Sequence, residues 1–370
     1  MALVSPAKIK MTAVVYKLER NTLISQLRDH FSGEPQLHRI ERIMNRFGLI
    51  LLALIFIAAV ICIAFGASYF TTISGIQEGL GDAKLEEKLK QLGIVQSVEL
   101  KENSGIALSQ QYKDAMWMHN DSGCAPELFL VGNDGKTLAK CRVNQAVNKD
   151  WEDICCFSWK NKPKILVGDV GDNQLKRDQS RLLLIDEPKF ELSSKRSITH
   201  TILKHKTIEF RFEDGPRNCE AIAFDAKTRS ILMIEKIYIE VPKDKVPGVY
   251  QLQLKDDLTA VDGVAKRIGN YPTRNVTGMD IKGDRMVVRN YLFAHLIERG
   301  KDGWKKTFEQ KRFQNMALPI QRQGEAICFD KSGQFVFVAS EFIKQPLYRV
   351  TITDPKQAAT TSPEEQRKRK

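Results

Sequence analysis

The chain has 370 residues, of which 42% are hydrophobic and 28% charged, so it can form one large folded domain or two ordinary ones. Its formal net charge of +12 raises the question of nucleic-acid binding. The basic residues are spread along the whole chain, however, and no zinc-finger, KH or RRM signature accompanies them, so we expect no nucleic-acid partner.

The first predicted element is a transmembrane helix at residues 47–70. This segment, FGLILLALIFIAAVICIAFGASYF, has no charged residue and is long enough to cross a hydrocarbon core of about 30 Å. Because residues 1–46 precede it, it predicts a retained anchor rather than a cleaved signal peptide. Under the positive-inside rule, Arg39, Arg42 and Arg46 place the N-terminus in the cytoplasm. We therefore expect a single-pass protein of the cell inner membrane, with the rest of the chain in the periplasm.

Residues 71–95 are predicted to link the membrane to a folded domain. Within this linker DAKLEEKLKQLGI, at 82–94, has the spacing of a short helix. From residue 96 onward, β-rich runs alternate with Gly, Asp, Asn and Pro turns. We therefore expect an all-β domain at 96–355, followed by a disordered basic tail at 356–370 that ends in RKRK.

A recurring heptapeptide indicates internal repeats. WEDICCF at 151–157, CEAIAFD at 219–225 and GEAICFD at 324–330 align without gaps, and GMDIKGD at 278–284 fits the same frame. Each is followed by further short apolar runs separated by turns. Sets of four antiparallel strands, repeated roughly every 45–70 residues, are typical of a β-propeller. A β-sandwich would not explain the recurring Glu-Ala-Ile frame.

These repeats predict a single β-propeller following one N-terminal transmembrane helix. Five blades are favoured, and six would result if residues 180–218 held extra strands. The last unit lacks a fourth strand, while VQSVELK, at 95–101, has no unit of its own. We expect this N-terminal strand to complete the C-terminal blade, because closing the ring leaves no long exposed edge.

Acidic and amide side chains recur at the strand ends that a propeller gathers at the mouth of its central channel. Met279 replaces the repeated glutamate in the fourth frame, and Asp153 and Asp280 share the neighbouring position. Converging carboxylates need a counter-charge, and Ca²⁺ accepts six to eight oxygen ligands with loose geometry. In the alternative reading these residues are structural, forming turns or binding the backbone amides of a neighbouring blade. The candidate metal ligands are Asn120, Asp121, Glu152, Asp153, Asp169, Asp172, Glu220 and Glu325.

The stretch MWMHNDSG, at 116–123, gathers a histidine, an amide and a carboxylate at the end of one predicted strand. His119 and Asp121 are candidate catalytic groups, because a carboxylate beside an imidazole tunes its pKa for proton transfer. A structural, hydrogen-bonding role for His119 is the alternative. Arg289 lies where other repeats carry acids and is a third candidate, as a partner for an anionic substrate.

The cysteines leave two interpretations open. Cys62 lies in the predicted membrane segment, which leaves six in the exported part. An even number in an oxidising compartment permits disulfides, whereas buried free thiols are the alternative. The six are Cys124, Cys141, Cys155, Cys156, Cys219 and Cys328.

Several motifs together resemble a known group of proteins. HNDSG, DWEDI, GDVGDN, the EAIAFD and GEAICFD repeats and the closing SE…PLYRV resemble bacterial extracytoplasmic β-propellers over residues 96–352. More distantly, the sequence is similar to the phytase-like esterase, lactonase and strictosidine-synthase propellers. This resemblance implies that acids and amides at the mouth hold Ca²⁺, which polarises an ester or phosphate oxygen and activates water. The nucleophile, zinc and nucleotide motifs GxSxG, HExxH and the P-loop do not occur.

Two functions follow from these features. The first is a membrane-anchored, Ca²⁺-dependent hydrolase of phosphate esters, esters or lactones, acting on a small anionic substrate. The second is a non-enzymatic module that binds a protein partner at the cell envelope, with a structural metal or none.

Overall fold

The computed structural model describes residues 88–352, except 194, 195, 240 and 243. The predicted membrane segment 47–70 lies outside these described residues, as do the predicted cytoplasmic segment and the basic tail. Among the helices that are described, none has the length and apolar character needed to cross a membrane.

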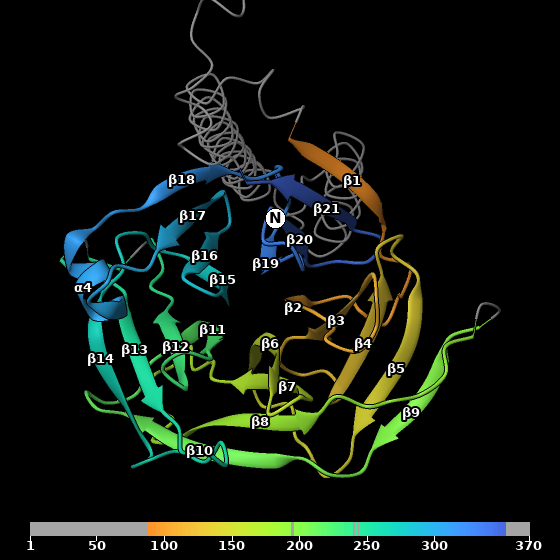
Figure 1. The fold of residues 1–370 in the computed structure, drawn as a ribbon, viewed down its shortest axis with the longest axis horizontal. Helices are drawn as coiled ribbons and strands as arrows, with labels where there is room; N and C mark the ends of the chain where they lie inside the picture. Colours follow the sequence, from red (N-terminus) through yellow and green to blue (C-terminus); the bar gives the residue numbers. More distant parts are fainter. Residues whose placement is uncertain (1–87, 194–195, 240, 243, 353–370) are drawn as a thin grey trace, which may run out of the picture. The chain divides into compact units, whose positions relative to one another are not determined.

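Apart from one helix, the regular elements of the described chain are strands, which confirms the all-β prediction, and all but one of these strands fall into five four-stranded units (Figure 1). The first unit contains β2 (Asn103–Leu108), β3 (Ala115–Asn120), β4 (Glu127–Gly132) and β5 (Thr137–Val143). The second contains β6 (Trp151–Trp159), β7 (Lys162–Asp169), β8 (Ser180–Asp186) and β10 (Lys206–Phe212). The third contains β11 (Cys219–Asp225), β12 (Ser230–Glu235), β13 (Gly248–Gln253) and β14 (Val264–Asn270).

The last two units follow the same plan. The fourth contains β15 (Val276–Lys282), β16 (Arg285–Asn290), β17 (Phe293–Glu298) and β18 (Gln314–Ala317), with helix α4 (Gly303–Gln310) before its last strand. The fifth contains β19 (Gly324–Phe329), β20 (Phe335–Ser340), β21 (Pro346–Thr351) and β1 (Leu89–Ile94). The inner strands β2, β6, β11, β15 and β19 contact one another in a closed ring. This radial arrangement is that of a β-propeller.

The strand that closes the ring is not the predicted one. The linker helix predicted at 82–94 is wrong for its last six residues, because β1 (Leu89–Ile94) is a strand that pairs antiparallel with β21. The segment VQSVELK, at 95–101, which was expected to close the ring, contains no strand. Leu89 and Leu92 have the spacing of a helix face, but a register shift after Gln91 lets both pack against the fifth unit. Pairing with β21 outweighs the local helical pattern.

The segment 180–218, where a sixth blade was considered, adds one further strand to an existing unit. β9 (Ile198–Ile202) pairs in parallel with the outer strand β5, beginning at Ala139 opposite Ile198. The second and third units are joined where β10 and β14 pair in parallel at Arg211 and Phe212, so their strands form one eight-stranded sheet.

Every inner strand carries a β-bulge at the same point, one residue after its start. The register shifts lie after Asn103, Trp151, Cys219, Val276 and Gly324. A bulge leaves one extra residue unpaired and re-aims its side chain. The five bulge residues are Ser104, Glu152, Glu220, Thr277 and Glu325.

This register corrects the sequence alignment of the fourth repeat. Thr277, not Met279, is the equivalent of the repeated glutamate. Asp153 and Asp280 therefore do not share a position, because Asp280 corresponds to Ala223 in the third unit. A two-residue shift in this alignment keeps every side chain on the same face of its strand. The hydrophobic pattern is therefore the same in both alignments and cannot distinguish them.

The core lies between adjacent units. The ring of Phe157 in the second unit stacks on Phe224 in the third, with ring centroids 3.8 Å apart. Trp117 of the first unit is fully buried among residues of the second, such as Ile154. All six described cysteines are free thiols, and the buried-thiol alternative is confirmed for Cys141, Cys155, Cys219 and Cys328, whereas Cys124 and Cys156 are partly exposed.

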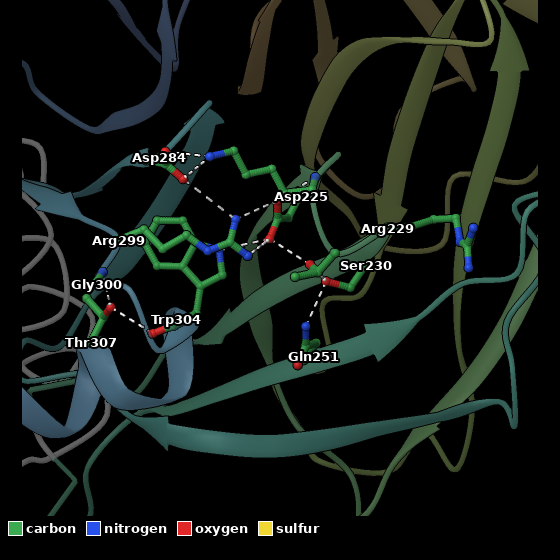
Figure 2. Close-up of polar contacts among 12 residues, drawn as sticks. Asp225, Arg229, Ser230, Gln251, Asp284, Arg299, Gly300, Trp304 and Thr307 are labelled. Atoms are coloured by element: carbon green, nitrogen blue, oxygen red, sulfur yellow. Dashed lines mark hydrogen bonds and ion pairs between the residues drawn. The ribbon is translucent and has the colours of Figure 1, made fainter.

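A polar network joins the third unit to helix α4 of the fourth (Figure 2). The Asp225 carboxylate accepts hydrogen bonds from Arg299 Nη1 and Nη2, at 3.2 and 2.6 Å, and from Trp304 Nε1 at 3.0 Å. The Arg299 guanidinium also lies over the Trp304 ring, 5.1 Å from its centroid. Asp225 and Trp304 are both buried, so this charged network fixes α4 against the neighbouring unit.

We expect Thr307→Val in this region to lower the free energy of unfolding by about 1–2 kcal/mol. The buried Thr307 hydroxyl accepts a hydrogen bond from Gly300 N at 2.8 Å and donates one to the Gly303 carbonyl at 2.9 Å. Valine has the same shape but leaves both backbone groups without this partner. Urea denaturation measures the loss, with Glu309→Gln as an exposed control in the same helix. Equal stability of Thr307→Val and the parent would contradict the prediction.

Candidate functional site

Two side-chain positions in each unit meet at one end of the ring, which we call the mouth. The first is the bulge residue near the start of the inner strand. The second is the residue that follows the second strand, which runs antiparallel and therefore ends beside that start. In chain order the second set consists of Asp121, Val170, Lys236, Tyr291 and Glu341.

A group of three carboxylates lies between the first and second units. Asp121 follows β3, Asp150 precedes β6, and Glu152 is the bulge residue of β6. One carboxylate oxygen from each lies within 4.8 Å of the other two. A Cβ at Gly171 would lie 2.2 Å from Glu152 Oε1 and 2.5 Å from Asp150 Oδ2, so a glycine is needed for the carboxylates to occupy this space. The group contains the oxygen ligands that hard cations prefer.

The surroundings of the three carboxylates favour their protonated forms. Burial raises the pKa of Asp121, Asp150 and Glu152, and repulsion raises it further, from Glu325 on Asp121 and from Asp121 on both Asp150 and Glu152. For Glu152 burial is the largest cause, followed by the charge of Glu220. A cation placed among them would reverse this tendency by stabilising the ionised forms.

Lys236 occupies the opposite side of the mouth as a resident counter-charge. Its buried ammonium forms an ion pair with Glu220 and lies 5.1 Å and 5.4 Å from the ring centroids of Tyr291 and Tyr238. Although burial alone would lower the pKa of Lys236, the charges of Glu220 and Glu325 raise it above its ordinary value. Lys236 is therefore protonated at neutral pH.

The acids around Lys236 are buried to different degrees. Glu220 accepts a further hydrogen bond from Asn218 Nδ2 at 3.1 Å, and burial raises its pKa to about 7. Glu325 is 3% exposed, and its Oε2 has no hydrogen-bond partner among the described residues. Burial, with repulsion from Glu325 and Asp121, raises the pKa of Glu341 to about 8. Three carboxyl groups therefore surround Lys236 at the mouth.

Three predicted metal ligands belong neither to the carboxylate group nor to the acids around Lys236. Asn120 uses its amide within the first unit, donating to the Glu99 carbonyl at 2.8 Å and accepting from Glu102 N at 3.0 Å. The buried Asp169 is neutralised by two arginines, with Arg177 Nη2 at 2.9 Å and Arg181 Nη2 at 2.7 Å. Asp172 Oδ2 accepts a hydrogen bond from Arg177 N at 2.7 Å, which closes a turn.

A fourth predicted ligand, Asp153, lies within the ring of inner strands. Its Oδ1 accepts a hydrogen bond from Ile154 N at 2.8 Å, and its Oδ2 accepts from Ile222 N and Met279 N at 2.9 and 3.2 Å. Asp280 binds Phe329 N in the same manner at 2.9 Å. The alternative of acids that bind the backbone amides of neighbouring units therefore describes these aspartates.

His119 and Arg289 hold equivalent positions in the first and fourth units, and both side chains are buried. Burial lowers the pKa of His119 to about 4, so its imidazole is neutral, and Nδ1 lies 3.0 Å from the Asn120 carbonyl oxygen. Arg289 donates to the carbonyls of Ala326 and Ala339 at 2.9 and 3.3 Å, which ties the fourth unit to the fifth. Both contacts are structural.

The cluster thus combines predicted and unpredicted residues. Among the eight predicted ligands, Asp121 and Glu152 lie in the carboxylate group, and Glu220 and Glu325 surround Lys236. Asp150, Lys236 and Glu341 were not among the predicted site residues. A usable signal existed for Lys236 and Glu341, since each directly follows a second strand as Asp121 does.

The raised pKa values predict a pH dependence of stability in the metal-free protein. The carboxyls of Glu220 and Glu341 have pKa values of about 7 and 8 in the folded chain, against an ordinary value of 4.5. Each therefore binds its proton more tightly when folded, and this contribution to the free energy of unfolding falls as the pH rises from about 4.5 to 8.

Chemical denaturation at pH 5 and pH 8 measures this effect. We expect Glu220→Gln and Glu341→Gln to gain stability relative to the parent on going from pH 5 to pH 8. The exposed Glu209→Gln should show no such change. A relative loss in both mouth variants over this interval would show that the sign is wrong.

Comparison with known proteins gives limited similarity. No family model matches the sequence, and no curated protein matches it. A gluconolactonase from Xanthomonas campestris is 9% identical, with a TM-score of 0.42, 72% of this chain covered and 89% of that chain. A glucose dehydrogenase is 9% identical, with a TM-score of 0.39 and coverage of 72% and 99%. The Pan2 WD40 domain of Neurospora crassa is 11% identical, with a TM-score of 0.37 and coverage of 72% and 96%. Similarities of this size carry no information about activity.

Proposed function

We propose that this protein is a membrane-anchored, extracytoplasmic hydrolase of esters, lactones or phosphate esters, with a Ca²⁺ site at the mouth of a five-bladed β-propeller. The anchor is the predicted segment 47–70, which lies outside the described residues. The five four-stranded units support the blade number. The observation that carries the proposal is the convergence of Asp121, Asp150 and Glu152 beside Gly171.

The residues of this group fit a hard divalent cation. All three donors are carboxylate oxygens, and the missing side chain at Gly171 leaves room for them to converge. Their pKa values are raised by burial and by repulsion from neighbouring carboxylates, and a bound cation would favour their ionised forms. When bound, Ca²⁺ would polarise an ester, lactone or phosphate oxygen and lower the pKa of a water molecule.

The chain's own residues supply the remaining chemistry. Glu220 is suited to take a proton from attacking water, because its pKa of about 7 lies near the operating pH. Lys236 stays protonated and would stabilise negative charge that develops on a substrate oxygen. The rings of Tyr238 and Tyr291 flank this ammonium and hold it in place. His119 and Arg289, the other catalytic candidates, have no role in this scheme because both are buried in structural contacts.

The test measures metal content and thermal melting of the full chain in detergent, first with a chelator and then with added Ca²⁺. A ligand at 100 times its Kd stabilises the folded state by about 2.7 kcal/mol, so we expect a rise of several degrees in Tm on adding Ca²⁺. Turnover of p-nitrophenyl acetate, p-nitrophenyl phosphate and δ-valerolactone is assayed in parallel. Absence of both a bound ion and a shift would contradict the metal site. A bound ion without turnover would support the metal site but contradict the proposed hydrolase activity.

A further inference from the structure

Exposed apolar side chains in the described part of the chain gather at the mouth. Nine large ones lie on loops that precede an inner strand or join the second strand of a unit to the third. None lies on the loops that join an inner strand to the second strand, at the opposite end. All five units contribute to this apolar collar, for example through Val98, Leu175, Ile239, Leu292 and Ile343.

Such a distribution points to an interaction surface. Single exposed apolar residues are normal when they are scattered over a protein surface. Here nine surround the mouth, whereas three, Leu192, Leu203 and Val261, lie on the loops between third and fourth strands at the opposite end of the described chain. Ile239 is 68% exposed and Ile320 is 65% exposed, so most of the surface of each of these two residues is in contact with water. A partner that covered the collar would remove this apolar surface from water.

One part of the collar is anchored by hydrogen bonds from a neighbouring unit. Arg274, which precedes β15 in the fourth unit, donates to five carbonyl groups of the loop between β12 and β13. The acceptors include the Ile239 carbonyl at 3.3 Å from Nη1 and the Lys245 carbonyl at 2.7 Å from Nη2. A loop that is ordered before binding loses less conformational entropy when a partner arrives. The exposed Ile239 is therefore preorganised for contact.

We propose that the mouth face docks a protein partner that presents a basic side chain within an apolar patch. The basic group enters the acidic mouth between Glu220, Glu325 and Glu341, and the surrounding apolar residues cover the collar. Charge complementarity selects the basic group, because carboxyls outnumber the cations Arg177, Lys236 and Arg289 at the mouth. A collar drawn from all five units suits a protein surface of about 800 Å² better than a small molecule.

The test places the photo-crosslinking residue p-benzoylphenylalanine at Ile239 or at Ile343 in the full chain, in the cells that naturally produce it. Val261, exposed on the loop between β13 and β14, is the matched control. We expect both mouth positions to give an adduct with the same protein and Val261 to give none. The cross-linked segment should contain a Lys or Arg with apolar neighbours.

Binding of a synthetic peptide with the sequence of that segment then tests the chemistry. Ile239→Ser and Ile343→Ser should each weaken its binding to the purified full chain by about tenfold, since central apolar contacts dominate such interfaces. Val261→Ser should leave the Kd unchanged, and replacing the peptide's basic residue by Gln should weaken binding to a similar degree. Adducts with lipid, with a second copy of the chain, or with no protein would overturn the proposal, as would binding that survives loss of the basic residue.

Discussion

Replacing Glu152 by Gln is expected to weaken Ca²⁺ binding at least tenfold and to remove most of the metal-dependent turnover. The amide has the same shape but carries no charge, and Ca²⁺ affinity depends strongly on ligand charge. In the absence of metal the same variant should be as stable as the parent or more stable, because Glu152 is buried and repelled by Glu220, Asp121 and Asp150. Calorimetric titration and melting with chelator measure the two effects, which have opposite signs.

Two further variants separate a metal site from a general loss of structure. Gly171→Ala changes no charge but places a Cβ against Glu152 Oε1 and Asp150 Oδ2, so it should also weaken Ca²⁺ binding. Asp256→Asn removes a fully exposed carboxylate paired with Lys160 and should leave the affinity unchanged. An unchanged Ca²⁺ affinity in both Glu152→Gln and Gly171→Ala would exclude this carboxylate group as the metal site.

Replacing Asp153 by Ala is expected to lower the free energy of unfolding by about 3–5 kcal/mol. The carboxylate accepts hydrogen bonds from Ile154 N, Ile222 N and Met279 N, which belong to three inner strands, and each donor that loses a buried acceptor costs about 1–3 kcal/mol. Urea denaturation measures the loss. Asp153→Asn keeps one acceptor oxygen and should fall between Ala and the parent.

The Asp153 variants also separate the structural role of this residue from the ligand role predicted from the sequence. The part of the Asp153→Asn sample that remains folded should bind Ca²⁺ as tightly as the parent, because the carboxylate lies among backbone amides and not in the group at Gly171. Weakened Ca²⁺ binding with undiminished stability would show that the structural assignment is wrong.

Much of the fold could be predicted because the structural repeat is visible as a repeated pattern of hydrophobic residues in the sequence. Strands of period two between turn residues identify each four-stranded unit, and a repeated Glu-x-Ile frame marks three of the inner strands directly. The closing strand was misplaced because residues 89–94 have apolar residues at helical spacing. Their strand conformation depends on pairing with β21, more than 250 residues away in the chain, which local sequence does not reveal.

The candidate site was predictable in part. Glu152, Glu220 and Glu325 were found because they repeat, and the structure places all three at bulges that face the mouth. Asp169 looks the same as these acids in the sequence, yet Arg177 and Arg181 neutralise it. Lys236 was missed because its role depends on the acids that other units bring to it.

The sequence by itself determined the all-β repeat, the chemical type of the mouth residues and the prediction of an N-terminal anchor. These properties depend on residue type and on spacing along the chain, which hydrophobic periodicity and charge record directly. Only the tertiary structure decided the register of the fourth repeat, the strand that closes the ring and the pairing of each acid. A shift of two residues preserves the faces of a strand, and a carboxylate binds whichever cation or amide the fold places beside it.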